Sequence, residues 1–135
     1  MALTILDAGV IIGVLDASDA HHQAARHAMR EALDRGDLLA VPASAYAESL
    51  VGPARQGREA MRRVEAYLVD LAADVEPITR QIAVRAALLR ARHGSRLPLP
   101  DALVLATALH LGAERVLTTD RGWPRVRLRV EVIPG

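Results

Sequence analysis

Short apolar runs alternate with longer segments of helical pattern along the whole chain, and this alternation constrains the fold more than any other feature. The runs lie at residues 3–6, 38–41, 115–118 and 130–133, and Val75 marks a further one. An alternation of strands with helices is typical of a parallel sheet covered by helices on both faces. We therefore expect an α/β fold, a three-layer α/β/α domain with a central parallel sheet of about five strands. Residues 1–135 should form one domain.

The segments between the strands carry apolar residues at the three- and four-residue spacing of helices. Ser44 is expected to cap the third helix, which should stop near Gly52, and Thr79 to cap the fifth. Gly94 and Gly112 should end the last two. The expected helices are 8–15, 20–34, 46–51, 57–72, 79–93 and 101–111.

The residue inventory excludes several mechanisms. The chain has no cysteine and no lysine, so all 17 basic residues are arginine. Thiol catalysis, thiolate zinc sites, Schiff-base nucleophiles and phosphate-binding P-loop lysines are therefore excluded. The net charge is +1, and the chain has neither a basic leader region nor an apolar run approaching about 18 residues. We expect a cytoplasmic protein that does not enter a membrane.

Four acids occupy positions where an α/β fold gathers functional groups. Asp7 and Asp120 follow strands, and ligands bind beyond the carboxyl ends of strands in such sheets. Asp101 lies in the first turn of a helix, whose N-terminus should keep its carboxylate ionised. Glu48 stands among apolar residues, where an acid is unusual. Taken singly, the aspartates could be helix caps and Glu48 could lie on a solvated helix face.

Convergence of these four acids would require a cation. Two unit charges about 4 Å apart repel by roughly 4 kcal/mol at an effective dielectric constant near 20. Only Asp120 has an arginine within three residues, namely Arg121. Oxygen ligands alone suit Mg²⁺ or Mn²⁺ rather than zinc. A carboxylate site of this kind cleaves phosphodiesters through metal-activated water.

Four segments of the chain resemble the acidic motifs of PIN domains. They are residues 4–12, 47–53, 99–108 and 116–120, and residues 16–22 also look like the loop after the first helix in VapC-type toxins. The similarity spans nearly the whole chain, with the motifs in order and at compatible spacing.

The resemblance implies a Mg²⁺- or Mn²⁺-dependent endoribonuclease that is the toxin of a type II toxin–antitoxin pair. It also implies a homodimer, a cognate antitoxin and an RNA substrate. By the same resemblance, Asp7, Glu48, Asp101 and Asp120 form the catalytic metal site, and Thr118 supports it. One position departs from the family pattern: a hydroxyl residue often follows the first acid, and here Ala8 does. This departure bears on rate and substrate preference rather than on the metal site.

Arginines are concentrated in two segments without acids, 78–99 and 121–130. Arginine suits phosphate oxygens, so these segments could hold RNA. A solvated face or an interface with an acidic partner is the alternative. The candidate RNA-binding residues are Arg85, Arg92, Arg96 and Arg121.

Two other functions are compatible with the same residues. A PIN-like module could bind RNA or a partner with little turnover. A metal-dependent phosphohydrolase on a similar sheet could instead act on DNA or nucleotides. The adjacent His21 and His22 diverge on a helix, which favours a surface or capping role over a metal pair. Trp123 is expected to anchor its own loop, and Gly9 and Gly13 to permit close helix packing.

Overall fold

Five parallel strands form a single sheet in the computed structural model, which describes residues 1–135. The sheet has the predicted parallel, five-stranded form, and its strand order is β3-β2-β1-β4-β5. The bounds are β1 (Leu3–Leu6), β2 (Leu38–Pro42), β3 (Asp74–Glu76), β4 (Arg115–Thr118) and β5 (Arg129–Val132).

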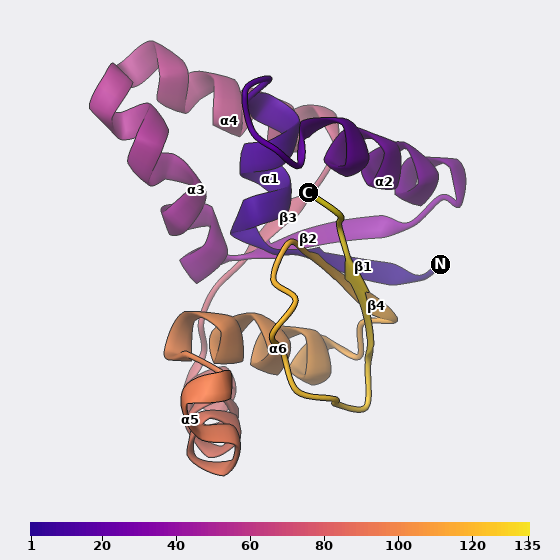
Figure 1. Ribbon diagram of the computed structural model, residues 1–135, viewed down its shortest axis with the longest axis vertical. Coiled ribbons are helices and arrows are strands. Elements are labelled where there is room, and N and C mark those ends of the chain that lie inside the picture. Colours follow the sequence, from indigo (N-terminus) through magenta and orange to yellow (C-terminus); the bar gives the residue numbers. More distant parts are fainter.

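Helices cover both faces of this sheet and complete three layers. The helices that precede β3 lie on one side of the sheet, and those that follow it lie on the other (Figure 1). The bounds are α1 (Ala8–Leu15), α2 (His22–Asp34), α3 (Ala43–Gln56), α4 (Arg58–Asp70), α5 (Arg80–His93), a short 3₁₀ turn (Gly94–Arg96) and α6 (Leu99–Leu111). No helix is long and apolar enough to cross a lipid bilayer.

The two central strands are buried because both of their faces are covered by helices. Ile5 pairs with Val116 and Leu6 with Leu117, and all four side chains are inaccessible to solvent. Short continuous apolar runs are the expected sequence of such strands. The ladder continues past β1, since the Asp7 amide donates to the carbonyl of Leu117 at 3.0 Å. The first acid is thereby fixed to the central strand pair.

Several boundaries differ from the predicted ones. The second helix begins at His22 rather than residue 20, and the last strand lies one residue earlier than predicted. The third helix does not stop near Gly52 but continues through Pro53 to Gln56. It packs along α4, and Gly57, with a φ of 126° that favours glycine, separates the two helices. Tertiary packing there outweighs the helix-breaking preference of proline.

The predicted caps have mixed outcomes. Thr79 caps α5, since its hydroxyl accepts from the Ile82 amide at 3.2 Å, and Gly112 ends α6 as predicted. Ser44 does not cap α3, because the helix already begins at Ala43 and the preceding Pro42 makes no side-chain cap. The Ser44 hydroxyl instead lies buried in the first turn without a hydrogen-bond partner.

Candidate active site

The carboxyl ends of β1 and β4 form the point where the strand order reverses. From β1 the chain adds β2 and β3 on one side, and then β4 and β5 on the other. Open α/β sheets bind ligands outside such a point. Asp7 directly follows β1, and Thr118 ends β4. This edge lies on the left in Figure 1 and is the natural place for a site.

Asp7 lies at the centre of this edge and is almost completely buried, with 9% of its surface exposed. One carboxylate oxygen accepts from the Ala8 amide at 2.8 Å and so caps α1. The other accepts from the Thr118 hydroxyl at 2.7 Å. Burial raises the pKa of Asp7; the hydrogen bonds from Thr118 and Ala8 oppose that effect, and the charge of Asp120 adds to it. Asp7 is therefore both a helix cap and a member of the acidic cluster.

Thr118 links Asp7 to Asp120. Its hydroxyl donates to Asp7 and accepts from the Asp120 amide at 3.1 Å. Asp120 in turn accepts from the Gly122 amide at 2.7 Å, which fixes the turn that follows β4. A single hydroxyl thus sets the relative positions of two acids at the ends of neighbouring strands.

Asp101 lies in the first turn of α6 and faces both of these acids. Burial raises its pKa to about 6; the indole of Trp123 lowers it, and the charges of Asp7 and Asp120 raise it further. The Trp123 N–H is buried and does not reach hydrogen-bond geometry with any acceptor, so it stabilises the carboxylate only weakly. The helix N-terminus therefore does not keep the pKa of Asp101 at its ordinary value, although a pKa of about 6 leaves the carboxylate mostly ionised at pH 7. Burial and neighbouring charges outweigh the helix dipole.

Glu48 is the most open of the four acids. It lies on the exposed side of the first half of α3. Partial burial of its carboxylate and then the charge of Asp7 raise its pKa. The charge of Asp7 therefore interacts with each of the other three acids, and Asp7 is the only one of them whose charge affects Glu48. This difference gives Glu48 access to solvent that the aspartates lack.

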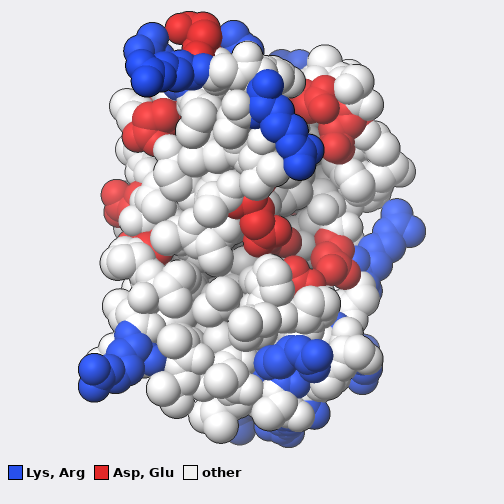
Figure 2. All heavy atoms as spheres, turned by 90° about the vertical axis from the view of Figure 1, so that its left-hand side faces the viewer, with Lys and Arg blue, Asp and Glu red and all other residues white.

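The four acids fit a hard divalent cation by donor chemistry, since they offer carboxylate oxygens and no basic side chain forms a salt bridge with any of them. Figure 2 shows acidic atoms near the middle of this face, with arginines above and below them. In this conformation, no group of three or more His, Cys, Asp or Glu side chains is arranged to hold a metal ion. The cluster would have to tighten around a cation.

The acids lie on an open face rather than in the large cavity elsewhere on the molecule. That cavity has a volume of about 530 Å³ and lies between α1, α3 and α4. None of the four acids lines it. A shallow site of this kind can admit a polymer, whereas an enclosed pocket favours a small molecule.

Gly9 and Thr119 form a close contact at this edge that the sequence did not reveal. A Cβ atom at Gly9 would come within 2.2 Å of the Thr119 hydroxyl oxygen. Glycine thus lets the start of α1 pack directly against the end of β4. Ala8 is 5% exposed and belongs to the apolar core, so residue 8 supplies no polar group to the site. Gly13 similarly lies close to Ala25 of α2, as expected of a packing glycine.

The predicted RNA-binding arginines are all exposed and lie at different places. Arg121 lines a groove next to Asp120, and Arg92 lines a second groove near the end of α5. Arg85 and Arg96 line neither groove. Sequence reasoning did not single out Arg125, which lines both. Its only signal was membership of an arginine-rich segment without acids.

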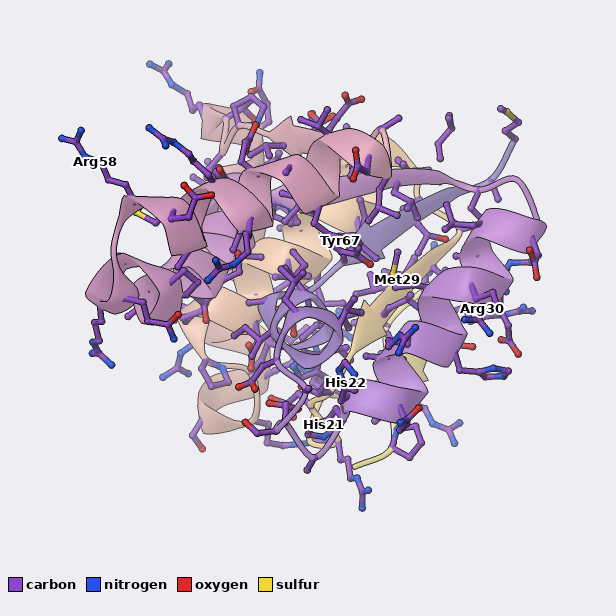
Figure 3. The ribbon with its side chains drawn as sticks, turned by 90° about the horizontal axis from the view of Figure 1, so that it is seen from above. His21, His22, Met29, Arg30, Arg58 and Tyr67 are labelled. Carbon is purple, nitrogen blue, oxygen red and sulfur yellow. The ribbon has the colours of Figure 1, made fainter.

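The histidines have structural surroundings. His22 Nδ1 lies 2.8 Å from the Gly13 carbonyl, and His21 Nδ1 lies 3.1 Å from Asp19. Figure 3 shows both side chains beside the start of α2. The prediction of a surface or capping role is in keeping with these contacts.

Comparison with known proteins gives the family. The model of the PIN domain matches residues 4–128. The chain belongs to the PIN domain family. PIN domains are typically nucleases and are generally metal-dependent. No curated protein matches the chain.

Solved structures of toxins share this PIN fold at low sequence identity. The VapBC structure from Salmonella typhimurium bound to DNA is 20% identical, with a TM-score of 0.68, covering 99% of this chain and 100% of that one. FitAcB from Neisseria gonorrhoeae is 20% identical, with a TM-score of 0.70 and coverage of 95% and 96%. Mycobacterium tuberculosis VapC20, described as a toxin that cleaves the sarcin-ricin loop, is 19% identical, with a TM-score of 0.67 and coverage of 84% and 86%. At these identities the likeness shows the fold.

Proposed function

We propose that this PIN domain is a metal-dependent endoribonuclease and the toxin of a type II toxin–antitoxin pair. The observation that carries the proposal is that Asp7, Asp101 and Asp120 lie close enough for their charges to interact, at the point where the strand order of the sheet reverses. The charge of Asp120 raises the pKa of Asp7, the charges of Asp7 and Asp120 raise the pKa of Asp101, and none of the three acids forms a salt bridge with an arginine. The likeness to toxin structures, one of them described as a toxin that cleaves the sarcin-ricin loop, supports the choice of substrate.

In this proposal the three aspartates hold Mg²⁺ or Mn²⁺. The bound cation would lower the pKa of a coordinated water and stabilise charge on the phosphate. Thr118 keeps Asp7 oriented, since it donates to the oxygen that does not cap α1. Glu48, which is open to solvent, orients the attacking water and accepts its proton. Direct binding of the cation by Glu48 is the other role open to it.

A cognate antitoxin and a homodimer belong to the same proposal. The similar structures include a toxin–antitoxin complex from Klebsiella pneumoniae, which is 22% identical, with a TM-score of 0.68. We expect the antitoxin to suppress activity by covering the open acidic face, since no lid of this chain encloses it.

The test compares the wild-type protein with the Asp101→Asn variant on RNA, single-stranded DNA and mononucleotides. The assays contain Mg²⁺, Mn²⁺ or a chelator. Wild type should cleave RNA only with metal, and the variant should cleave nothing. Expression without antitoxin should arrest growth for the wild type alone. Preferred cleavage of DNA or nucleotides would replace the endoribonuclease with a different phosphohydrolase.

A binding module with little turnover is the second candidate. It is favoured by one observation, the lack of any three acids already arranged around an ion. The same assay separates the two functions. RNA binding and growth arrest without cleaved RNA, equal in wild type and Asp101→Asn, would establish the binding module.

A further inference from the structure

A basic groove lies on the opposite side of the sheet from α1, near the carboxyl end of α5. Its volume is about 410 Å³. Arg92 and His93 line it from α5, and Arg125 and Arg127 line it from the segment between β4 and β5. The remaining lining side chains are apolar, and no acid is among them. None of the three arginines forms a salt bridge.

Intramolecular contacts account for only part of this arrangement. Arg92 and His93 lie in the last turn of α5, where positive charge complements the helix dipole. Arg125 and Arg127 belong to no helix. They line the same groove although they are more than thirty residues from Arg92 in the sequence. Gathering like charges around an apolar floor costs free energy unless an anion accompanies them. The charge of the groove is therefore complementary to that of an anionic ligand.

A second groove lies beside the acidic site and shares two lining residues with the basic groove. It has a volume of about 350 Å³ and is lined by Asp120, Arg121 and Trp123 among others. Arg125 and Val126 line both grooves. Arginine side chains therefore line the surface from Asp120, past Arg121 and Arg125, to the end of α5, and we call this surface the path.

We propose that this path binds the phosphates of single-stranded RNA that flank the cleaved bond. The inference rests on the proposed function, which it deepens by locating the substrate strand. A polynucleotide offers repeated phosphates, and the arginine fork can contact each of them with two hydrogen bonds. Trp123 is the only Phe, Tyr or Trp side chain that lines either groove, so most contacts along the path are to the RNA backbone rather than by base stacking. Binding there tolerates different base sequences.

The experiment neutralises the path while leaving the four acids intact. Arg92→Gln, Arg125→Gln and Arg127→Gln are combined in the Asp101→Asn background, so that bound RNA is not cleaved. The matched control combines Arg30→Gln, Arg55→Gln and Arg58→Gln, which removes the same charge. Figure 3 shows Arg30 and Arg58 pointing outward from α2 and α4, and no control arginine forms a salt bridge. Circular dichroism and thermal unfolding establish that both triple variants are folded.

Affinity for a fluorescent single-stranded RNA is measured by anisotropy at several salt concentrations. Each lost phosphate contact on a single strand reduces the slope of log K against log salt by about 0.7. The path variant should therefore lose about two units of slope, and at low salt at least about tenfold in affinity. The control should change the slope by less than about half a unit.

Equal slopes in the path and control variants would overturn the inference. If the path variant then keeps RNA affinity but loses affinity for a poly-glutamate probe, the ligand is an acidic protein segment. If the wild-type protein does not cleave RNA, the proposed nuclease activity is rejected. The binding inference is still tested separately, because RNA affinity is measured in the Asp101→Asn background. An absence of RNA binding by both wild type and Asp101→Asn would reject the endoribonuclease itself.

Discussion

At each edge of the sheet an aspartate side chain is buried against a threonine, but the pKa of the aspartate is lowered at one edge and raised at the other. At the amino edge, Asp37 accepts from the Thr4 hydroxyl at 3.0 Å and from two nitrogens of Arg35 at 2.9 and 3.2 Å. Burial opposes ionisation there, but the bonds from Arg35 and Thr4 hold the pKa of Asp37 below its ordinary value. The charge of this aspartate is balanced within the chain.

At the carboxyl edge, Asp7 accepts from Thr118 and from the Ala8 amide but has no cation beside it. Burial and the charge of Asp120 leave its pKa raised. A buried ion needs a partner, and at this edge the chain supplies none. The comparison indicates that Asp37 has a structural role, whereas Asp7 and the neighbouring acids can bind a cation from solution.

The largest expected effect is on catalysis. Asp7→Asn should reduce RNA cleavage by about 100-fold or more, because it removes charge needed to hold the metal while keeping the helix cap. Asp37→Asn should change cleavage by less than about twofold, since the amino edge lies at the other end of the strands. Initial rates under saturating metal measure both. Comparable losses in the two variants would show that the acids affect activity through folding alone.

Stability should respond in the reverse order. Asp37→Asn should lower the free energy of unfolding by about 1–3 kcal/mol, because Arg35 loses a charged acceptor. Asp7→Asn should be neutral or stabilising at pH 7 without metal, since it removes a buried charge from an acidic cluster. Urea unfolding at pH 7 in a chelating buffer gives both values. A strongly destabilised Asp7→Asn would mean that Asp7 acts mainly as the cap of α1.

The acidic edge was predictable because its residues follow local patterns. Asp7 directly follows β1 and Asp120 lies two residues after β4, and parallel strands bring such positions to one edge. The order of the strands placed them side by side across the reversal point. The course of α3 through Pro53 was not predictable, because packing against α4 rather than local propensity decides it.

Contacts between distant segments account for the other differences. The raised pKa of Asp101 depends on charges from Asp7 and Asp120, which lie in other segments, whereas its helix position alone predicts the opposite shift. The Gly9–Thr119 contact joins residues that are 110 positions apart in the sequence. No local sequence pattern predicts such a contact.

That contact gives a third prediction, which tests how firmly the acidic edge is held. Gly9→Ala should destabilise the protein by about 1–3 kcal/mol, because its methyl group would overlap the Thr119 hydroxyl. Adding Thr119→Ala removes the overlapping oxygen and should recover about half of the loss. A double-mutant cycle from urea unfolding measures the coupling. Additive effects would show that the start of α1 shifts freely and that Asp7 is not held by this packing.

The smallest expected effect is the pH dependence of stability. Because the pKa of folded Asp101 is about 6, above its ordinary value, the folded state holds a proton that the unfolded state has lost. The resulting stabilisation is present below the ordinary pKa and disappears as the pH rises toward 6. Since Asp101 is partly exposed and screened by solvent, the change should be below about 1 kcal/mol. Thermal unfolding of wild type and Asp101→Asn between pH 4 and 8 should show a smaller decline in the variant.

Added Mg²⁺ sharpens this last comparison between the two edges. A cation that binds the ionised cluster should raise the unfolding temperature of the wild type at pH 8 and have less effect at pH 5, where protons compete for Asp101. Asp37→Asn should keep the full rise in unfolding temperature with Mg²⁺, since Asp37 pairs with Arg35 and does not belong to the cation site. Asp101→Asn should lose most of it. A response equal at both pH values, or unchanged in Asp101→Asn, would mean that the cation acts through the general surface charge and that the raised pKa of Asp101 has no connection with metal binding.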